Sequence, residues 1–266
     1  MNKRGQVTVY VIVGIVIVVS VFLVFYFLGD RIQKQTETEV VFDESSLEPL
    51  QDYVGDCITQ ITDEALDKIG KQGGDISPEL YISYNWPEED YSSNVAYICY
   101  TDNFNACINY RPFLAKHVEE ELESYIINGL RSCIDLERMR QGGFVVSADL
   151  NGMNVDVNIG DYNVITNLDF PITITKGDTS ITENRFTKTF DIPLGKLLDV
   201  SRDIIDTEII NGVFNADGYL GYSEVVEIYH HKPGDSIIYR IVLTQDRLSN
   251  QNYYYFQFAI KNYVSP

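Results

Sequence analysis

The most constraining feature of this chain is an uncharged stretch near its start, residues 7–28 (VTVYVIVGIVIVVSVFLVFYFL). At a rise of about 1.5 Å per residue, a helix of this length spans about 33 Å, close to the thickness of a bilayer's hydrocarbon core. A core helix of a globular protein usually keeps a polar face, which this stretch lacks. The stretch therefore predicts one transmembrane helix in contact with membrane lipid, and a buried core helix is the less favoured alternative.

A cleavable secretory signal is the main competing interpretation. Such signals combine an apolar core of about 7–15 residues with small residues at an A-x-A-like cleavage site. Here the core is longer, and it ends in Tyr26, Phe27 and Leu28, which form no such site. The sequence therefore favours an uncleaved anchor.

The orientation of this anchor follows from the cysteines more than from charge. Lys3 and Arg4 precede the stretch, and Arg31 and Lys34 follow it, so the positive-inside rule gives nearly a tie. All four cysteines follow the stretch: Cys57, Cys99, Cys107 and Cys133. An even number of cysteines, all on one side of a membrane helix, is typical of a protein domain in an oxidising, extracytoplasmic space. We expect residues 1–6 in the cytoplasm and the body outside the cell membrane; four free thiols in a cytosolic domain are the alternative.

The acidic composition of the chain limits its partners. The formal net charge is −19 at pH 7, and the pI is near 4.4. Nucleic-acid binding requires clustered lysine and arginine, so we expect no nucleic-acid partner. Aromatic residues make up 12% of the chain, too many for a disordered tail. The composition indicates a folded body and leaves open a protein partner or self-assembly.

Hydrophobic periodicity divides the rest of the chain into three parts. Residues 29–44 are polar and weakly periodic, which predicts a stalk or linker. Residues 45–142 predict a helix-rich lobe with the cysteines, and residues 143–266 a β-rich lobe with one helix, although the two also suit a single domain. Apolar residues recur at steps of three and four in about three amphipathic helices: 45–72, 112–140 and 194–210. The predicted fold class is α+β.

Beyond residue 143 the apolar pattern alternates with a period of two, as in half-buried strands. Residues 144–150 and 153–159 flank Asn151-Gly152, which predicts an antiparallel hairpin closed by a type I′ turn. Further alternating segments predict an antiparallel meander. The aromatic run at residues 253–258 is expected to form a strand with one face in the core and the other open as an aromatic contact surface.

The cysteines belong to a short internal repeat. Cys57-Ile58 precedes Gln72-Gly73-Gly74, and Cys133-Ile134 precedes Gln141-Gly142-Gly143. The two Cys-to-Gln separations differ by seven residues, nearly two helical turns, so both cysteines hold a similar angular position before their glycine stop. This pattern favours one bridge between packed helices, Cys57–Cys133, and one local bridge, Cys99–Cys107. A chance match of two glycine stops is the alternative, because four cysteines allow three pairings.

The sequence contains no motif that indicates catalysis or metal binding. It lacks H-E-x-x-H, C-x-x-C, G-x-S-x-G and Walker-type glycine loops. His117 lies among glutamates on a predicted helix, where it is expected to be solvated, and His230 and His231 point to opposite faces of a predicted strand. The acidic residues around Asn151 lack the EF-hand spacing for calcium. We therefore expect no catalytic residue, no metal site, no cofactor and no enzymatic activity.

A short motif precedes the apolar helix: Lys3-Arg4-Gly5-Gln6. It resembles the class III signal peptide of archaeal type IV pilin-like proteins. The resemblance implies possible processing between Gly5 and Gln6, after which the helix would pack in a filament core. Tyr10 lies five places after that bond, where bacterial-type pilins carry glutamate. The body's Cys-Ile…Gln-Gly-Gly pattern is similar to that of single-pass surface proteins of small-genome archaea, which implies no activity.

Three functions fit these observations, in descending order. The first is a membrane-anchored, non-enzymatic surface protein with a structural, contact or adhesion role. The second is a pilin-like filament subunit whose N-terminal helix forms the filament core. The third is an anchored hydrolase of envelope polymers, which would need a cleft that contains a carboxylate of raised pKa.

Overall fold

A computed structural model describes residues 48–103, 105–140, 145–216, 219, 226–244 and 253–263. These residues belong to one compact unit, Phe42–Pro266, and the chain's other unit is Met1–Val41. The predicted transmembrane helix, the stalk, and the processing residues Gly5 and Gln6 therefore lie outside the described residues. Within the described ranges, no helix is long and apolar enough to cross a membrane.

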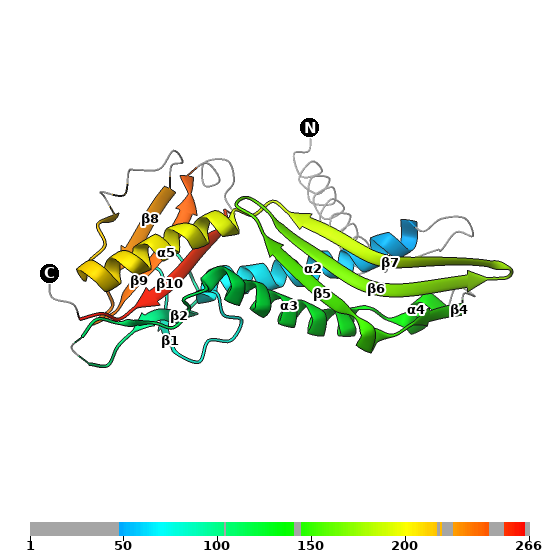
Figure 1. The fold of residues 1–266 in the computed structure, drawn as a ribbon, viewed down its shortest axis with the longest axis horizontal. Helices are drawn as coiled ribbons and strands as arrows, with labels where there is room; N and C mark the ends of the chain where they lie inside the picture. Colours follow the sequence, from blue (N-terminus) through cyan, green and yellow to red (C-terminus); the bar gives the residue numbers. More distant parts are fainter. Residues whose placement is uncertain are drawn as a thin grey trace, which may run out of the picture. The chain divides into compact units, whose positions relative to one another are not determined.

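The described body is α+β, as predicted, and its three long helices bury the apolar stripes that periodicity predicts (Figure 1). α2 spans Glu48–Gln72, α3 spans Leu114–Cys133 and α5 spans Leu194–Asn211. Stripe residues at most 7% exposed include Leu50, Val54, Cys57, Ile58, Ile61, Ala65 and Ile69 in α2, Val118, Leu122, Ile126 and Leu130 in α3, and Leu197, Leu198, Ile204 and Ile205 in α5. Because isolated helices are marginal in water, this burial is what stabilises them.

Glycine ends α2 where the sequence predicts a stop. Gly73 and Gly74 have φ angles of +76° and +90°, a backbone conformation that residues with a side chain rarely adopt. The Gly74 amide donates to the Ile69 carbonyl at 3.0 Å. A Cβ atom on Gly74 would also lie 3.0 Å from a methyl carbon of Val118, so the same glycine allows α2 and α3 to approach each other closely.

The single helix predicted over residues 112–140 is wrong at its C-terminal end. α3 stops at Cys133, because Ile134 adopts an extended conformation with a ψ angle of 103°. A short helix, α4 (Leu136–Arg140), follows. The Asp135 carboxylate accepts hydrogen bonds from the amides of Glu137 and Arg138 at 2.9 and 3.2 Å, and so starts a new helix instead of continuing the old one. The expected stop at Gly142-Gly143 lies outside the described residues.

One sheet has six strands, drawn from both halves of the body. Its order is β1-β2-β10-β9-β8, with β3 also paired to β2. The strands are β1 (Tyr81–Tyr84), β2 (Ser93–Tyr100), β3 (Ile108–Asn109), β8 (Val226–His231), β9 (Ile237–Leu243) and β10 (Tyr255–Ile260). β2 pairs with β10 in parallel, and the remaining pairs are antiparallel. The pairing of β2 with β10 joins the segments on either side of residue 142 in one sheet.

The second sheet has four strands arranged around a long central one, β6 (Val164–Lys176). β7 (Thr179–Phe190) pairs with β6 along its length. β4 (Val145–Ala148) and β5 (Asn154–Ile159) both pair antiparallel with β6, at different positions along it. β4 and β5 therefore run in the same direction, end to end.

This arrangement contradicts the predicted hairpin at Asn151-Gly152. β4 and β5 are not paired with each other, and a 3₁₀ turn at Leu150–Gly152 connects them. A type I′ turn needs positive φ at both central residues, and neither Asn151 nor Gly152 has it. The Asp149 carboxylate instead accepts the Asn151 amide at 2.9 Å, and β6 is long enough to pair with both flanking strands. The chain reverses direction at the turn between the antiparallel strands β6 and β7, where Gly177 has a φ angle of +60°.

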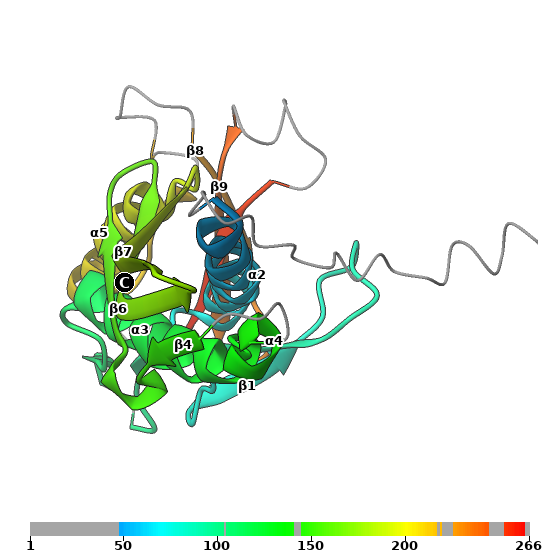
Figure 2. The same ribbon diagram turned by 90° about the vertical axis from the view of Figure 1, so that its right-hand side faces the viewer.

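The helices lie against both sheets. α2 packs on α3, on β2 and β10 of the six-stranded sheet and on β7 of the four-stranded sheet. α3 packs on β5 and α5, and α5 covers β9 and β10. Figure 2 shows α2 next to β7. The main core therefore lies between the helices and the inner faces of the two sheets.

Two disulfides link these elements. Cys57 of α2 is bonded to Cys133 at the end of α3, with the Cα atoms 5.9 Å apart. Cys99 of β2 is bonded to Cys107, just before β3, with the Cα atoms 5.4 Å apart. These are the two bridges that the repeated Cys-Ile…Gln-Gly-Gly pattern favours. Tyr53 supports the first bridge, because its hydroxyl donates to the Cys133 carbonyl at 3.1 Å.

Candidate functional site

A groove of about 560 Å³ lies between the start of α3, the end of β5 and α5. The segment at residues 109–116 forms one wall, and one stripe of α5 forms the other. Leu114, Leu198 and Ile205 contribute buried apolar side chains, and Ile159 a partly buried one. The volume is within the range of about 300–1,000 Å³ that is usual for ligand sites.

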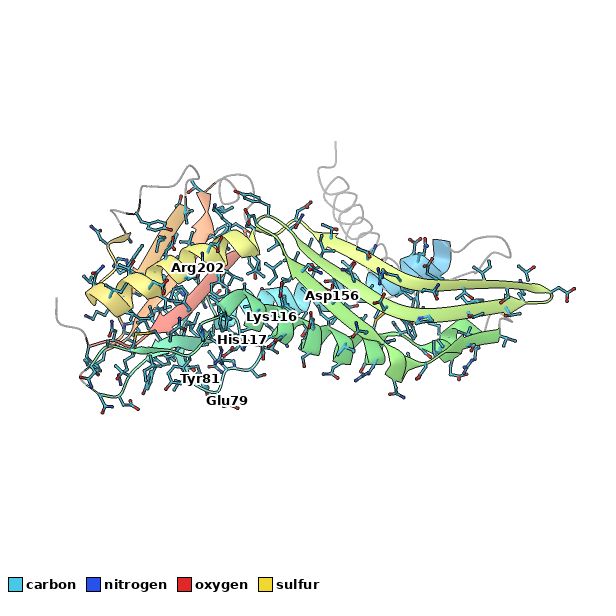
Figure 3. The ribbon with its side chains drawn as sticks, viewed as in Figure 1. Glu79, Tyr81, Lys116, His117, Asp156 and Arg202 are labelled. Atoms are coloured by element: carbon cyan, nitrogen blue, oxygen red, sulfur yellow. A yellow bond between two sulfur atoms is a disulfide. The ribbon has the colours of Figure 1, made fainter. Side chains whose placement is uncertain are left out.

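Charged side chains of both signs line this groove. Three are cationic and three are carboxylates: Arg111, Lys116, Arg202, Asp161, Asp199 and Asp206. Arg202 and Asp199 form an ion pair at 3.1 Å on the surface of α5. Lys116 lies 3.7 Å from Glu119, which does not line the groove. Figure 3 labels Lys116 and Arg202 on neighbouring helices. The groove therefore presents equal numbers of cationic and anionic side chains.

Arg111 is held in place by a buried carboxylate. Asp75 lies just beyond α2, and its side chain is only 7% exposed. It accepts hydrogen bonds from Nε and Nη2 of Arg111 at 3.2 and 3.0 Å, and Nη1 of Arg111 donates to the Tyr110 carbonyl at 3.2 Å. This bidentate pairing fixes the plane of the guanidinium at the groove wall.

His117 completes this cluster, which corrects the expectation that it is solvated. Its Nε2 hydrogen-bonds to a carboxylate oxygen of Asp75, and its side chain is 24% exposed. Burial alone would raise the pKa of the Asp75 carboxyl, but hydrogen bonds from His117 and Arg111 outweigh burial and hold this pKa below its ordinary value. Asp75 is therefore charged at neutral pH, and it orients both of its partners.

Phe113 is the most exposed large apolar residue at the groove. Phe113 falls within the helix predicted over residues 112–140, whose apolar residues are expected to be buried, but it is 79% exposed. Phe113 is the N-cap residue of α3, so it lies before the first helical turn and outside the apolar stripe that begins at Leu114. An exposed phenylalanine lacks the stabilisation of about 1.5–3 kcal/mol that burial of its side chain would provide. At the rim of this groove, the ring of Phe113 is therefore accessible to a ligand.

A second groove of about 420 Å³ lies between α2 and α3. Tyr125 donates to the Glu64 carboxylate, and Lys68 lies 3.0 Å from the same carboxylate. These hydrogen bonds lower the pKa of Glu64, the bond from Tyr125 most of all. The polar groups in this groove thus bond chiefly to one another and tie α2 to α3.

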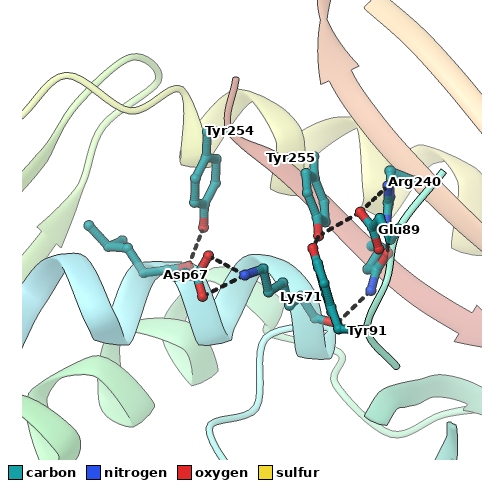
Figure 4. Close-up of polar contacts among 9 residues, drawn as sticks. Asp67, Lys71, Glu89, Tyr91, Arg240, Tyr254 and Tyr255 are labelled. Carbon is teal, nitrogen blue, oxygen red and sulfur yellow. Dashed lines mark hydrogen bonds and ion pairs between the residues drawn. The ribbon is translucent and has the colours of Figure 1, made fainter. Parts of the chain in front are cut away.

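The aromatic run at residues 253–258 does not form the open contact surface that we expect from sequence. Phe256 and Phe258 are fully buried in the core. The opposite face carries Gln257, which is also fully buried, and Tyr255, whose hydroxyl hydrogen-bonds to that of Tyr91 at 3.0 Å (Figure 4). Burial raises the pKa of Tyr255. The segment at residues 85–92, between β1 and β2, covers this face.

Arg240 of β9 is the centre of the covered face. Its guanidinium carbon lies 4.0 Å from the ring centroid of Tyr255 and 4.3 Å from that of Trp86. It forms an ion pair with Glu89 at 2.8 Å (Figure 4). Gln257 accepts hydrogen bonds from Arg240 and from the Trp86 indole at 2.8 Å. All of these contacts are internal, so they stabilise the body.

The remaining histidines are separated, as the strand pattern predicts. His230 is exposed, whereas His231 stacks on Trp86 with ring centroids 4.5 Å apart and hydrogen-bonds to Tyr84 through Nδ1. In the described part of the chain, no group of three or more His, Cys, Asp or Glu side chains is arranged to hold a metal ion.

Sequence reasoning missed the α3–α5 groove, although α5 carries a signal for it. Asp199, Arg202 and Asp206 are spaced by three and four residues, so they form one charged stripe along the helix. The wall opposite this stripe comes from the connection between β3 and α3, which lies far away in the sequence. No family model, no curated protein and no solved structure matches this chain.

Proposed function

We propose that this chain is a membrane-anchored, extracytoplasmic surface protein with a structural or contact role and no enzymatic activity. The observation that carries the proposal is the pair of disulfides, Cys57–Cys133 and Cys99–Cys107, which uses every cysteine of the chain. Structural disulfides persist in oxidising compartments and are rare where thiols are kept reduced. The uncharged stretch at residues 7–28 supplies the anchor, and membrane lipid is its partner.

The body has the stiffness that a contact module requires. The Cys57–Cys133 bridge fixes α2 to α3, which contact the two sheets. The Cys99–Cys107 bridge closes the loop between β2 and β3. With a net charge of −19, the surface resists self-association and favours a basic partner over an acidic one.

The hydrolase alternative receives no support from the grooves. It requires a cleft with a carboxylate whose pKa is raised. Burial raises the pKa of Asp63, but this residue lies on the exposed face of α2 and lines neither of the two grooves. Asp75, the buried carboxylate that holds Arg111 at the wall of the larger groove, has a pKa below its ordinary value, the opposite of what a general acid needs.

The redox state in cells tests the proposal. Cells quenched in acid are treated with a maleimide polymer that adds a fixed mass to each free thiol. We expect no mass shift without reductant and a shift of four polymer units after reduction, because the chain has four cysteines. Four reactive thiols before reduction would place the body in a reducing compartment and refute the proposal.

A further inference from the structure

We infer that the groove between α3 and α5 binds a neutral oligosaccharide. This inference rests on the proposed contact role and names the class of ligand that the surface would contact. It is drawn from four properties of the groove: its balance of charge, its apolar side chains, its exposed aromatic rim and the fixed guanidinium of Arg111.

The balance of charge disfavours ligands that carry a strong net charge. The groove has three cationic side chains and three carboxylates, so an anion or a cation meets as much repulsion as attraction. A neutral polyol carries no net charge and meets no such repulsion. Each sugar hydroxyl donates one hydrogen bond and accepts others, so carboxylates and guanidinium groups both satisfy it. Adjacent hydroxyls suit the pair of Asp199 and Arg202, whose charged atoms lie 3.1 Å apart.

The apolar side chains of the groove suit the C–H face of a sugar ring. A pyranose ring has a face of C–H groups that packs on apolar and aromatic surfaces. Leu114, Leu198 and Ile205 contribute apolar side chains to the groove. Phe113 is 79% exposed at the rim, where it offers a free aromatic face to a ring.

One polar group, the guanidinium of Arg111, is held in place before a ligand arrives, which lowers the entropic cost of binding. Asp75 and the Tyr110 carbonyl fix the guanidinium of Arg111. Asp199 and Arg202 sit on α5, a helix of 18 residues. Amides of Gly195 and Lys196, in the first turn of α5, donate to the carbonyls of Gly160 and Asp161 at 3.3 and 3.2 Å, so α5 is tied to the loop that carries Asp161.

The test measures binding of defined neutral trisaccharides to the full-length protein. The detergent must have no sugar headgroup, because a maltoside would compete for the groove. The probes are trisaccharides of glucose, mannose, galactose and N-acetylglucosamine, each titrated by saturation-transfer NMR. We expect saturable binding of at least one of them, with transfer strongest to protons on one face of a ring.

Two variants assign the binding to this groove. Phe113→Ala removes the aromatic rim, and because Phe113 is so exposed the fold should be unaffected; we expect affinity to fall about tenfold. Arg202→Gln removes the guanidinium and should weaken binding to a similar degree. Tyr81→Ala is the matched control, since Tyr81 is 44% exposed and does not line the groove; we expect unchanged affinity.

Three results would overturn the inference. One is that none of the trisaccharides binds. Another is that Phe113→Ala and the wild-type protein bind equally well. The last is that inorganic phosphate binds and Arg202→Gln abolishes that binding, which would make the groove an anion site. None of these results alters the redox state of the cysteines, so failure of the sugar site is distinguishable from failure of the proposed surface role.

Discussion

The two disulfides should contribute unequally to stability, because they close loops of very different length. Cys57 and Cys133 are 76 residues apart, whereas Cys99 and Cys107 are only 8 apart. In the chain-entropy description, the long loop is worth about 4.5 kcal/mol and the short loop about 2.5 kcal/mol of unfolding free energy. Replacing each pair by alanine should therefore cost about 2 kcal/mol more for Cys57→Ala/Cys133→Ala than for Cys99→Ala/Cys107→Ala.

The comparison is informative because burial and loop length act in opposite directions. Cys99 and Cys107 are both at most 5% exposed, whereas in the other bridge Cys57 is buried and Cys133 is only partly buried. Loss of buried sulfur alone would cost more for the short bridge, so a larger cost for the long bridge reports the loop length. For a domain of this size, about 2 kcal/mol corresponds to a difference of roughly 4–8 °C in Tm.

Urea unfolding followed by tryptophan fluorescence provides the assay. Trp86 is the chain's sole tryptophan and is buried against Arg240, so its emission reports loss of the body's packing. The free energies of unfolding of the two variants should be compared only if both variants have the same slope of free energy against urea concentration. If the Cys99→Ala/Cys107→Ala variant is equally or more destabilised, the loop-length argument is wrong.

Further predictions concern pH, a glycine stop and the N-terminus. Because the pKa of Asp75 is lowered in the folded state, its stabilising contribution is present above the ordinary aspartate pKa of about 3.9 and is lost as pH falls through the lower folded value. Asp75→Asn should lower the free energy of unfolding by about 1–2 kcal/mol at pH 7, a figure already reduced because solvent screens the partly exposed Arg111, and by less in acid. A loss that does not depend on pH would contradict this prediction. Gly74→Ala should destabilise more than Gly177→Ala in thermal unfolding, because both have positive φ but only Gly74 faces crowding atoms; equal losses would mean that the contact with Val118 is unimportant. If the chain is a pilin-like subunit, intact mass of the native protein should begin at Gln6; a mass that includes Met1 would count against that alternative.

The sequence predicts the local elements of this body well, because they depend on periodicity within one segment. The buried stripe of α2 and the glycine stop at Gly73-Gly74 both appear in the structure. The cysteine pairs that the sequence favours are also the ones in the structure, although α3 ends at Cys133 and the helical register assumed beyond that cysteine is wrong.

Features that depend on distant segments were not accessible. The alternating segments around Asn151 suit a hairpin, but the edge of β6 pairs with both of them. The spacing of glutamates around His117 indicates a solvated face, yet Asp75 packs on it from beyond the end of α2. The groove likewise combines α5 with the start of α3, two elements about 80 residues apart whose contact no local pattern reveals.

The orientation of the chain in the membrane is the most direct test of its proposed role. Intact cells expressing the protein with one epitope tag at each terminus are treated with a protease that cannot cross the membrane. We expect the C-terminal tag to be lost from intact cells, while the N-terminal tag is protected until the cells are lysed. A C-terminal tag that survives in intact cells and disappears only after lysis would contradict an extracytoplasmic body.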